Sequence, residues 1–127
     1  MTALVKARTH VNFGTVEEPG TLTSASIDTS ATRALRVRAV LSTAVGLPRE
    51  ARLLVRLVAD EPHGSIGSGY TLAEVDLLAV EGGKWVQDFD PVFHAAVRVV
   101  AVSSGHISPL GSLQVEVHRV DDAPEPV

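Results

Sequence analysis

The alternation of apolar and polar residues in several short segments is the feature that most constrains how this chain folds. In "RALRVRAVL", residues 33–41, leucine, valine and alanine fall on every second position, with two arginines between them. Successive side chains of a β-strand point to opposite faces, so this period of two predicts a strand with one buried face. The pattern recurs in "ARLLVRLVAD" (51–60), "AAVRVVAV" (95–102) and "SLQVEVHRV" (112–120). The sequence therefore predicts half-buried β-strands.

Four further segments complete the set of expected strands, and the first two show the alternation more weakly. They are "TALVKARTHVNF" (2–13), "TLTSASID" (21–28), "YTLAEVDLLAV" (70–80) and "KWVQDF" (84–89). Glycine and proline between the segments predict turns, and we expect two hairpins, one pairing 33–41 with 51–60 and one pairing 70–80 with 84–89. The fold class predicted is all-β, an antiparallel two-sheet β-sandwich resembling a jelly roll, with about seven or eight strands and little or no helix.

The segment 72–79 is the one place where a helix competes with a strand. An amphipathic helix there would bring Leu72, Val75, Leu78 and Ala79 to one face, whereas a strand would bury Val75 and Leu77. Both readings stay open from the sequence. With the strand reading, the predicted core is Leu35, Val37, Leu53, Val55, Leu57, Val75, Leu77, Val97, Val99, Val115 and Val117.

Length and charge bound the organisation and the partners. A chain of 127 residues with 45% hydrophobic content suits a single domain, which we place at 1–120, followed by a flexible acidic tail at 121–127. The net charge of -4 argues against nucleic acid and membrane surfaces as partners. The chain contains no cysteine, and its N-terminus lacks the unbroken apolar run of a secretory signal.

The stretch "EPHGSIGSGYT", residues 61–71, is the only one that resembles a ligand-binding motif. It lacks the Gly-Lys-Ser/Thr ending and the following helix of a phosphate-binding loop, so we interpret it as a connection between strands. Such a loop can still form a contact at the rim of the domain. The candidate ligand loop is His63, Ser65, Ser68 and Tyr70, joined by Trp85 because exposed aromatic rings bind sugars.

No residue pattern nominates a metal centre or a catalytic group. The five histidines, His10, His63, His94, His106 and His118, are scattered singly and are expected to be solvated where they lie in loops. Asp88 and Asp90, with Asp60 or Glu61, would offer carboxylates to calcium, but no glycine-punctuated calcium pattern accompanies them. No serine lies in a Gly-x-Ser-x-Gly elbow. We therefore expect no metal, no cofactor and no enzymatic activity.

An arginine-rich outward face is the candidate interaction surface. The alternation places arginine and some apolar residues of 33–41 and 50–59 away from the core, and arginine is favoured at protein interfaces. The residues are Arg36, Arg38, Val40, Arg52, Leu54, Arg56 and Val58. The alternative for the arginines is ordinary cross-strand pairing with Glu74, Asp76 and Glu116.

The stretches "IDTSATRALRVRAVLS", "LAEVDLLAVEGGKWVQDF" and "SLQVEVHRV" resemble the jelly-roll or galactose-binding-like sandwich modules of phage and bacterial proteins, over roughly residues 13–120. In those modules an Asp-x-Ser turn precedes a strand with Leu-x-Val alternation, which corresponds here to Asp28, Ser30, Leu35 and Val37.

The resemblance concerns the fold, and the function is inferred from other features. The lack of a candidate catalytic group, of cysteine and of a secretory signal, together with the apolar residues on the outward face and the short tail, favours a non-enzymatic structural or interaction protein. The leading expectation is a phage virion component, a head-decoration or tail-associated protein that acts through multivalent protein contacts, as a homo-oligomer or on a virion lattice. The alternative is an extracellular carbohydrate-binding module, because one fold of this kind serves several functions.

Overall fold

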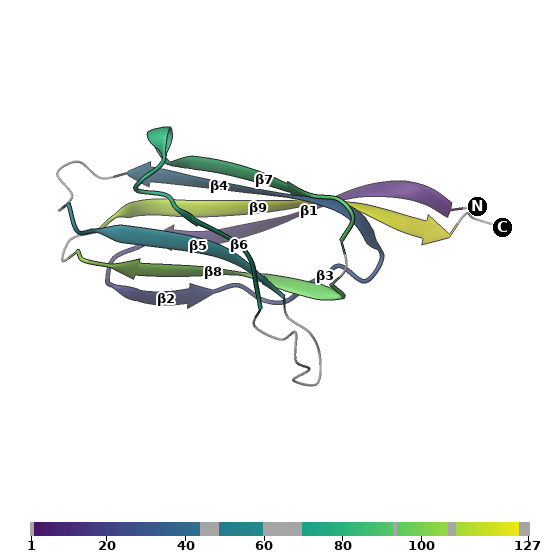
Figure 1. Ribbon diagram of the computed structural model, residues 1–127, viewed down its shortest axis with the longest axis horizontal. Coiled ribbons are helices and arrows are strands. Elements are labelled where there is room, and N and C mark those ends of the chain that lie inside the picture. The colour runs from purple at the N-terminus through teal and green to yellow at the C-terminus, as the bar shows by residue number, and fades with distance from the viewer. Residues whose placement is uncertain (1, 44–48, 60–69, 93, 107–108, 125–127) are drawn as a thin grey trace.

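The computed structural model describes residues 2–43, 49–59, 70–92, 94–106 and 109–124. These residues form two antiparallel sheets packed face to face (Figure 1). Sheet A has the order β1 (Thr2–Thr15), β9 (Gly111–Pro124), β4 (Thr32–Thr43), β7 (Lys84–Phe89). Sheet B has the order β2 (Gly20–Thr23), β8 (Ala96–Ser104), β5 (Arg52–Ala59), β6 (Thr71–Asp76), and β3 (Ile27–Asp28) also pairs with β8. The predicted all-β sandwich is confirmed.

Both predicted hairpins are wrong, because the strands of each pair belong to different sheets. β4 pairs with β9 and β7, whereas β5 pairs with β8 and β6. The connections after β4 and after β6 therefore cross from one layer to the other. Each sheet has one apolar face, and crossing connections let the two apolar faces cover each other. Alternation identifies the buried face of a strand but carries no information about its neighbour.

The helical reading of 72–79 is also wrong. β6 ends at Asp76, whose Oδ1 accepts hydrogen bonds from the backbone N–H groups of Leu78 (3.1 Å) and Leu53 (3.2 Å). The side chain of Asp76 thus stops the strand and starts a turn that leads to the 3-10 helix η2 (Glu81–Gly83). Nothing in the described part of the chain is a helix able to cross a membrane.

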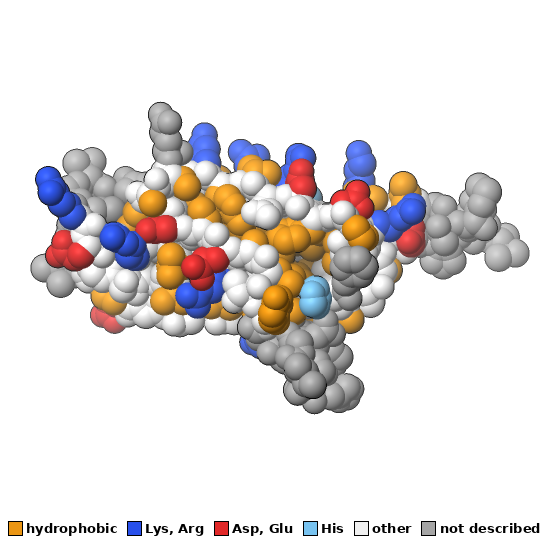
Figure 2. All heavy atoms as spheres, in the orientation of Figure 1, with side chains coloured by type: hydrophobic (Ala, Val, Ile, Leu, Met, Phe, Trp, Pro, Cys, Tyr) orange, Lys and Arg blue, Asp and Glu red, His pale blue; other side chains and the backbone are white. Residues whose placement is uncertain are grey.

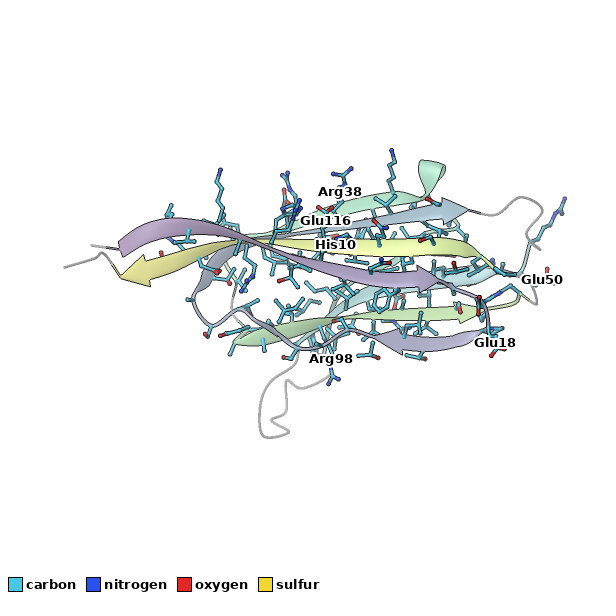
Figure 3. All side chains as sticks on the ribbon, turned by 180° about the vertical axis from the view of Figure 1, so that it is seen from behind. His10, Glu18, Arg38, Glu50, Arg98 and Glu116 are labelled. Carbon is cyan, nitrogen blue, oxygen red and sulfur yellow. The ribbon has the colours of Figure 1, made fainter. Side chains whose placement is uncertain are left out.

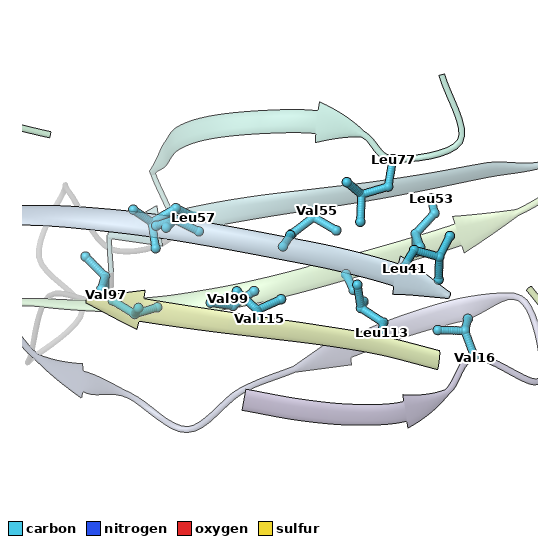
Figure 4. Packing of buried hydrophobic residues seen from close by; sticks show 14 of the residues in the cluster. Val16, Leu41, Leu53, Val55, Leu57, Leu77, Val97, Val99, Leu113 and Val115 are labelled. Carbon is cyan, nitrogen blue, oxygen red and sulfur yellow. The ribbon is translucent and has the colours of Figure 1, made fainter. Parts of the chain in front are cut away.

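The core lies between the sheets and is almost entirely aliphatic (Figure 4). Every predicted core residue is buried except Val75, which is half-buried because β6 is an edge strand of sheet B. Val37, Leu53 and Val115 have no measurable exposure. Burying a side chain of this size stabilises the fold by about 1.5–3 kcal/mol, so a core built this way does not need cysteine or metal.

The longest strands, β1 and β9, extend past the rest of the sandwich and carry both termini (Figure 1). They pair along their length, from Thr2 opposite Pro124 to Thr15 opposite Ser112. β9 therefore continues past residue 120, where we expected a flexible tail to begin. Thr32 of β4 donates a hydrogen bond from its hydroxyl to Asp121 Oδ1 (2.6 Å), which fixes the base of this extension. Residues 125–127 lie outside the described residues.

Candidate interaction surfaces

The arginine-rich surface expected from the sequence is divided between two opposite faces of the molecule. Arg36, Arg38 and Val40 lie on β4 and point outward from sheet A, while Arg52, Leu54 and Arg56 lie on β5 and point outward from sheet B. Figure 3 shows Arg38 on the outer side of sheet A and Arg98 of β8 on the far side of sheet B. The expectation of one continuous surface is therefore wrong, because β4 and β5 do not pair.

Val58, predicted to point outward, is buried, with 5% of its surface exposed. β5 keeps an uninterrupted register with β8, in which Val58 lies opposite Arg98, so Val58 remains at an outward position of the strand. The irregularity in the β5–β6 pair lies on β6, where Leu72 is the extra residue between Ala73, opposite Leu57, and Thr71, opposite Val58. Alternation therefore assigned Val58 to the correct face but could not show that this part of the outer face is covered.

On sheet A, the best-defined ion pair joins β4 to β7. Arg36 donates from Nε to Asp88 Oδ1 (2.6 Å) and from Nη2 to Asp88 Oδ2 (3.0 Å). The hydrogen bonds from Arg36 hold the pKa of Asp88 below its ordinary value, and the same contact raises the pKa of Arg36. Asp88 was, with Asp90, one of the two carboxylates first considered for calcium, and in this structure both of its carboxylate oxygens accept hydrogen bonds from Arg36. Both side chains are exposed, so this pair contributes little to the free energy of folding and mainly fixes the orientation of the two side chains.

On sheet B, the arginines make the cross-strand pairs that we gave as the ordinary alternative. Arg56 donates from Nε to Glu74, its register partner on β6. Arg52 lies 3.6 Å from Asp76, measured from Nε to Oδ2. The outer face of sheet B therefore carries nearly balanced charge.

The outer face of sheet A is, in contrast, predominantly basic. Its outward positions carry the cations Lys6, Arg8, Arg36, Arg38 and Lys84 and three acids, Asp88, Glu116 and Asp122; Asp122 also lies 3.7 Å from Arg33, measured from Oδ1 to Nε. Basic side chains project along the upper edge of Figure 2. Part of this face forms an open groove of about 820 Å³, lined by Lys6, Arg36, Arg38 and Lys84 and by Val86 at its apolar side. Such a surface attracts carboxylate or phosphate groups.

Glu116 lies in the middle of this face, opposite His10 of β1 and Arg38 of β4 (Figure 3). Its Oε2 is 2.9 Å from His118 Nε2 on the same strand. This hydrogen bond, followed by the charge of Arg8, keeps the pKa of Glu116 below its ordinary value despite some desolvation. Sequence reasoning missed the basic face, since its cations come from β1, β4 and β7, and only the pairing order brings these strands together.

The candidate ligand loop is only partly described. His63, Ser65 and Ser68 lie outside the described residues. Tyr70 is 64% exposed and immediately precedes β6, whereas Trp85 lies on β7 and packs partly against the core. The two rings lie beyond opposite ends of β6 and in different sheets, so they do not share one flat face for a sugar.

Two of the histidines share one face of the molecule. His10 of β1 and His118 of β9 lie on the outer face of sheet A, opposite Glu116 and Arg8 respectively, whereas His94 lies shortly before β8. His106, expected to be a solvated loop residue, is buried, with 3% of its surface exposed, because the turn after β8 folds it inward. Among the described residues, no three His, Asp or Glu side chains gather in a group that would hold a metal ion. Asp60 and Glu61 fall outside that set.

No protein-family model matches this chain, and no curated protein matches its sequence. Similarity is found among solved structures. One is described as Bacillus endospore appendages that form a family of disulfide-linked pili; its TM-score is 0.57 at 8% identity, over 97% of this chain and 92% of the other. The SPBc2 prophage-derived protein YomS has a TM-score of 0.49 at 14% identity, over 92% of this chain and 96% of the other. A family 6 carbohydrate-binding module has a TM-score of 0.38 at 12% identity, over 95% of this chain and 94% of the other.

At 8% identity, the likeness to the pilus structure concerns the fold, and it agrees with the sandwich described above.

Proposed function

We propose that this chain is a non-enzymatic structural subunit that works in many copies on a particle surface, as a phage head-decoration or tail-associated protein. The observation that carries the proposal is the extension formed by β1 and β9. It holds Leu4 and Val5 away from the core, with 57% and 46% of their surfaces exposed. Adjacent aliphatic side chains left exposed on a projecting element are available for a contact with another protein.

The positions of the charged side chains support a binding role over a catalytic one. The strongest charged contacts in the described part of the chain, Arg36 with Asp88 and Arg56 with Glu74, join neighbouring strands and lie on open sheet faces. A catalytic site would instead gather an acid, a base and a nucleophile in an enclosed pocket.

The similar fold of the Bacillus pilus protein supports the same view, because that fold serves there in a repeating assembly. That pilus is described as disulfide-linked, whereas this chain contains no cysteine. Copies of this chain would therefore be held by non-covalent contacts, and weak contacts repeated over a lattice give high total affinity.

Immunogold electron microscopy tests the proposal, with antibodies raised against the folded protein and applied to phage particles and surface structures from a producing culture. Gold at regular positions on heads or tails is the expected result. Gold on cell-surface filaments alone would overturn the virion assignment. Labelling that is confined to soluble protein would overturn the structural role as well. A matched culture that lacks the coding sequence is the control.

A further inference from the structure

β1 is an edge strand with a long unpaired side. It ends the order of sheet A, so among the described strands only β9 pairs with it. It spans 14 residues, whereas the edge strands β6 and β7 have 6 residues each and β2 has 4. An unpaired edge presents backbone N–H and C=O groups that another strand can bind, and the risk grows with the length of the edge.

The outer end of β1 is also the part least supported by its own molecule. The pairing of β4 with β9 ends at Asp121, the partner of Thr32, and one further hydrogen bond runs from the backbone N–H of Asp122 to the carbonyl oxygen of Ala31 (2.8 Å). Beyond Leu4, the partner of Asp122, the ribbon therefore consists of β1 and β9 alone (Figure 1). A two-stranded ribbon is marginally stable in water, and a third strand stabilises it.

Leu4 and Val5 make this end of the strand apolar on both sides. Neighbouring residues of a strand point to opposite faces, so Leu4 lies on the face of Lys6 and Val5 lies on the core-side face. Both are more than two-fifths exposed, at 57% and 46%. An additional strand beside β1 would cover part of both side chains.

The charges along β1 restrict how a second copy can pair with it. In an antiparallel pair of two copies, a two-fold axis passes through one residue, and residues equally far before and after it face each other. An axis at Lys6 or at Arg8 sets that residue opposite its own copy, and an axis at Ala7 sets Lys6 opposite Arg8. All three arrangements place like charges directly opposite each other, which is destabilising. Further along, the irregularity between Asn12 and Gly14 interrupts a regular ladder. A centre at Val5 sets Lys6 opposite Leu4 and aligns Thr2–Arg8 of both copies. A centre at Leu4 also avoids the clash but gives a shorter ladder.

We propose that β1 pairs antiparallel with β1 of a second copy about a two-fold axis at Val5, so that two sheets A become one continuous sheet. This inference rests on the proposed function and names the contact between copies. The two Val5 side chains face each other on one side, and Leu4 of each copy lies against the aliphatic stem of Lys6 of the other. The occupant is a second copy because its charge pattern fits this register.

Cysteine cross-linking tests the register directly, since the native chain has no cysteine. In the V5C variant the two thiols would face each other with Cα atoms roughly 4.5–5.5 Å apart, within disulfide reach. V86C is the matched control, because Val86 is also an exposed valine (54%) on an edge strand of sheet A. Disulfide dimers are measured on non-reducing gels. We expect V5C to cross-link roughly a hundredfold faster than V86C, because pairing raises the effective thiol concentration.

A second pair of variants keeps the test independent of oxidation. V5K would oppose two lysines at the axis, so sedimentation equilibrium at low salt should show at least roughly tenfold weaker dimerisation than for V86K.

Equal cross-linking of V5C and V86C in a protein that still self-associates would overturn the β1 contact and leave the structural role standing. A wild-type chain that stays monomeric would overturn the inference, while the gold-labelling result would still decide the proposed function. L4C cross-linking faster than V5C would overturn the axis at Val5.

Discussion

Arg36 and Asp88 give the clearest prediction at the level of single residues, because their contact depresses the pKa of Asp88 in the folded state. A carboxylate with a depressed folded pKa stabilises the fold above its unfolded pKa of about 3.9, and the contribution is lost as the pH falls through the folded value. NMR titration should therefore find the pKa of the Asp88 carboxyl below the usual range, and the R36Q substitution should return that pKa to the usual range. R38Q is the control, because it removes a neighbouring arginine that is not hydrogen-bonded to Asp88, and it should leave the pKa of Asp88 low. An unchanged Asp88 titration in R36Q would contradict the assigned cause.

Gly105 gives a second prediction, at the turn after β8. Its φ is +73°, and an added Cβ would lie 2.3 Å from the backbone oxygen of Glu50. Gly82 has the same φ of +73° with no atom within 4 Å of an added Cβ, so G82A isolates the backbone strain. We expect G82A to cost about 1 kcal/mol and G105A at least about 1 kcal/mol more, because a backbone clash adds to the strain. Urea unfolding measures both, and equal values would show that the turn relaxes.

At the level of elements, the covered part of the outer face of β5 at Val58 yields a prediction that alternation alone would not give. Val58 is buried, while Leu54, two turns of the pleat earlier, is half-buried on the outer face. Asparagine at 58 buries an amide at this covered position, so V58N should cost about 2–4 kcal/mol. L54N should cost less than half of that. Thermal and urea unfolding followed by circular dichroism make the comparison, and the reverse order would show that Val58 is not covered in the folded protein.

The strands show how much of the fold the sequence could predict. The inward faces of β4, β5, β8 and β9 follow from alternation alone, because a period of two assigns each side chain to a face. Their partners do not follow, because β4 pairs with a strand far along the chain and not with the next one. The run "ALV" at 3–5 was the one local sign of the projecting end of β1, since it places apolar residues on both faces. The charge pattern of the sheet A face had no local sign, because it depends on strand order.

For the whole molecule, the adjacency of the chain ends leads to a prediction about stability. Thr2 and Pro124 are Cα partners, so a short linker can join the ends without disturbing the strands. Closing the chain restricts the unfolded state, and the stabilisation expected for a loop of this length is at most about 4–5 kcal/mol. A circularised chain should unfold at higher urea than the linear chain carrying the same linker. An equal midpoint would indicate that β1 and β9 already remain together in the unfolded ensemble.

The same adjacency determines how the molecule responds to mechanical load. Hydrogen bonds of an antiparallel pair run perpendicular to the strands, so tension applied between the two termini breaks the β1–β9 bonds one at a time, as in a zipper. Tension that enters along β1 and leaves at the opposite end of the sandwich, near Glu18 and Glu50 (Figure 3), loads the bonds of that pair together in shear. A fibre or shell made of such subunits would therefore withstand pulling only if its connections run through the sandwich from end to end, and not from one terminus to the other.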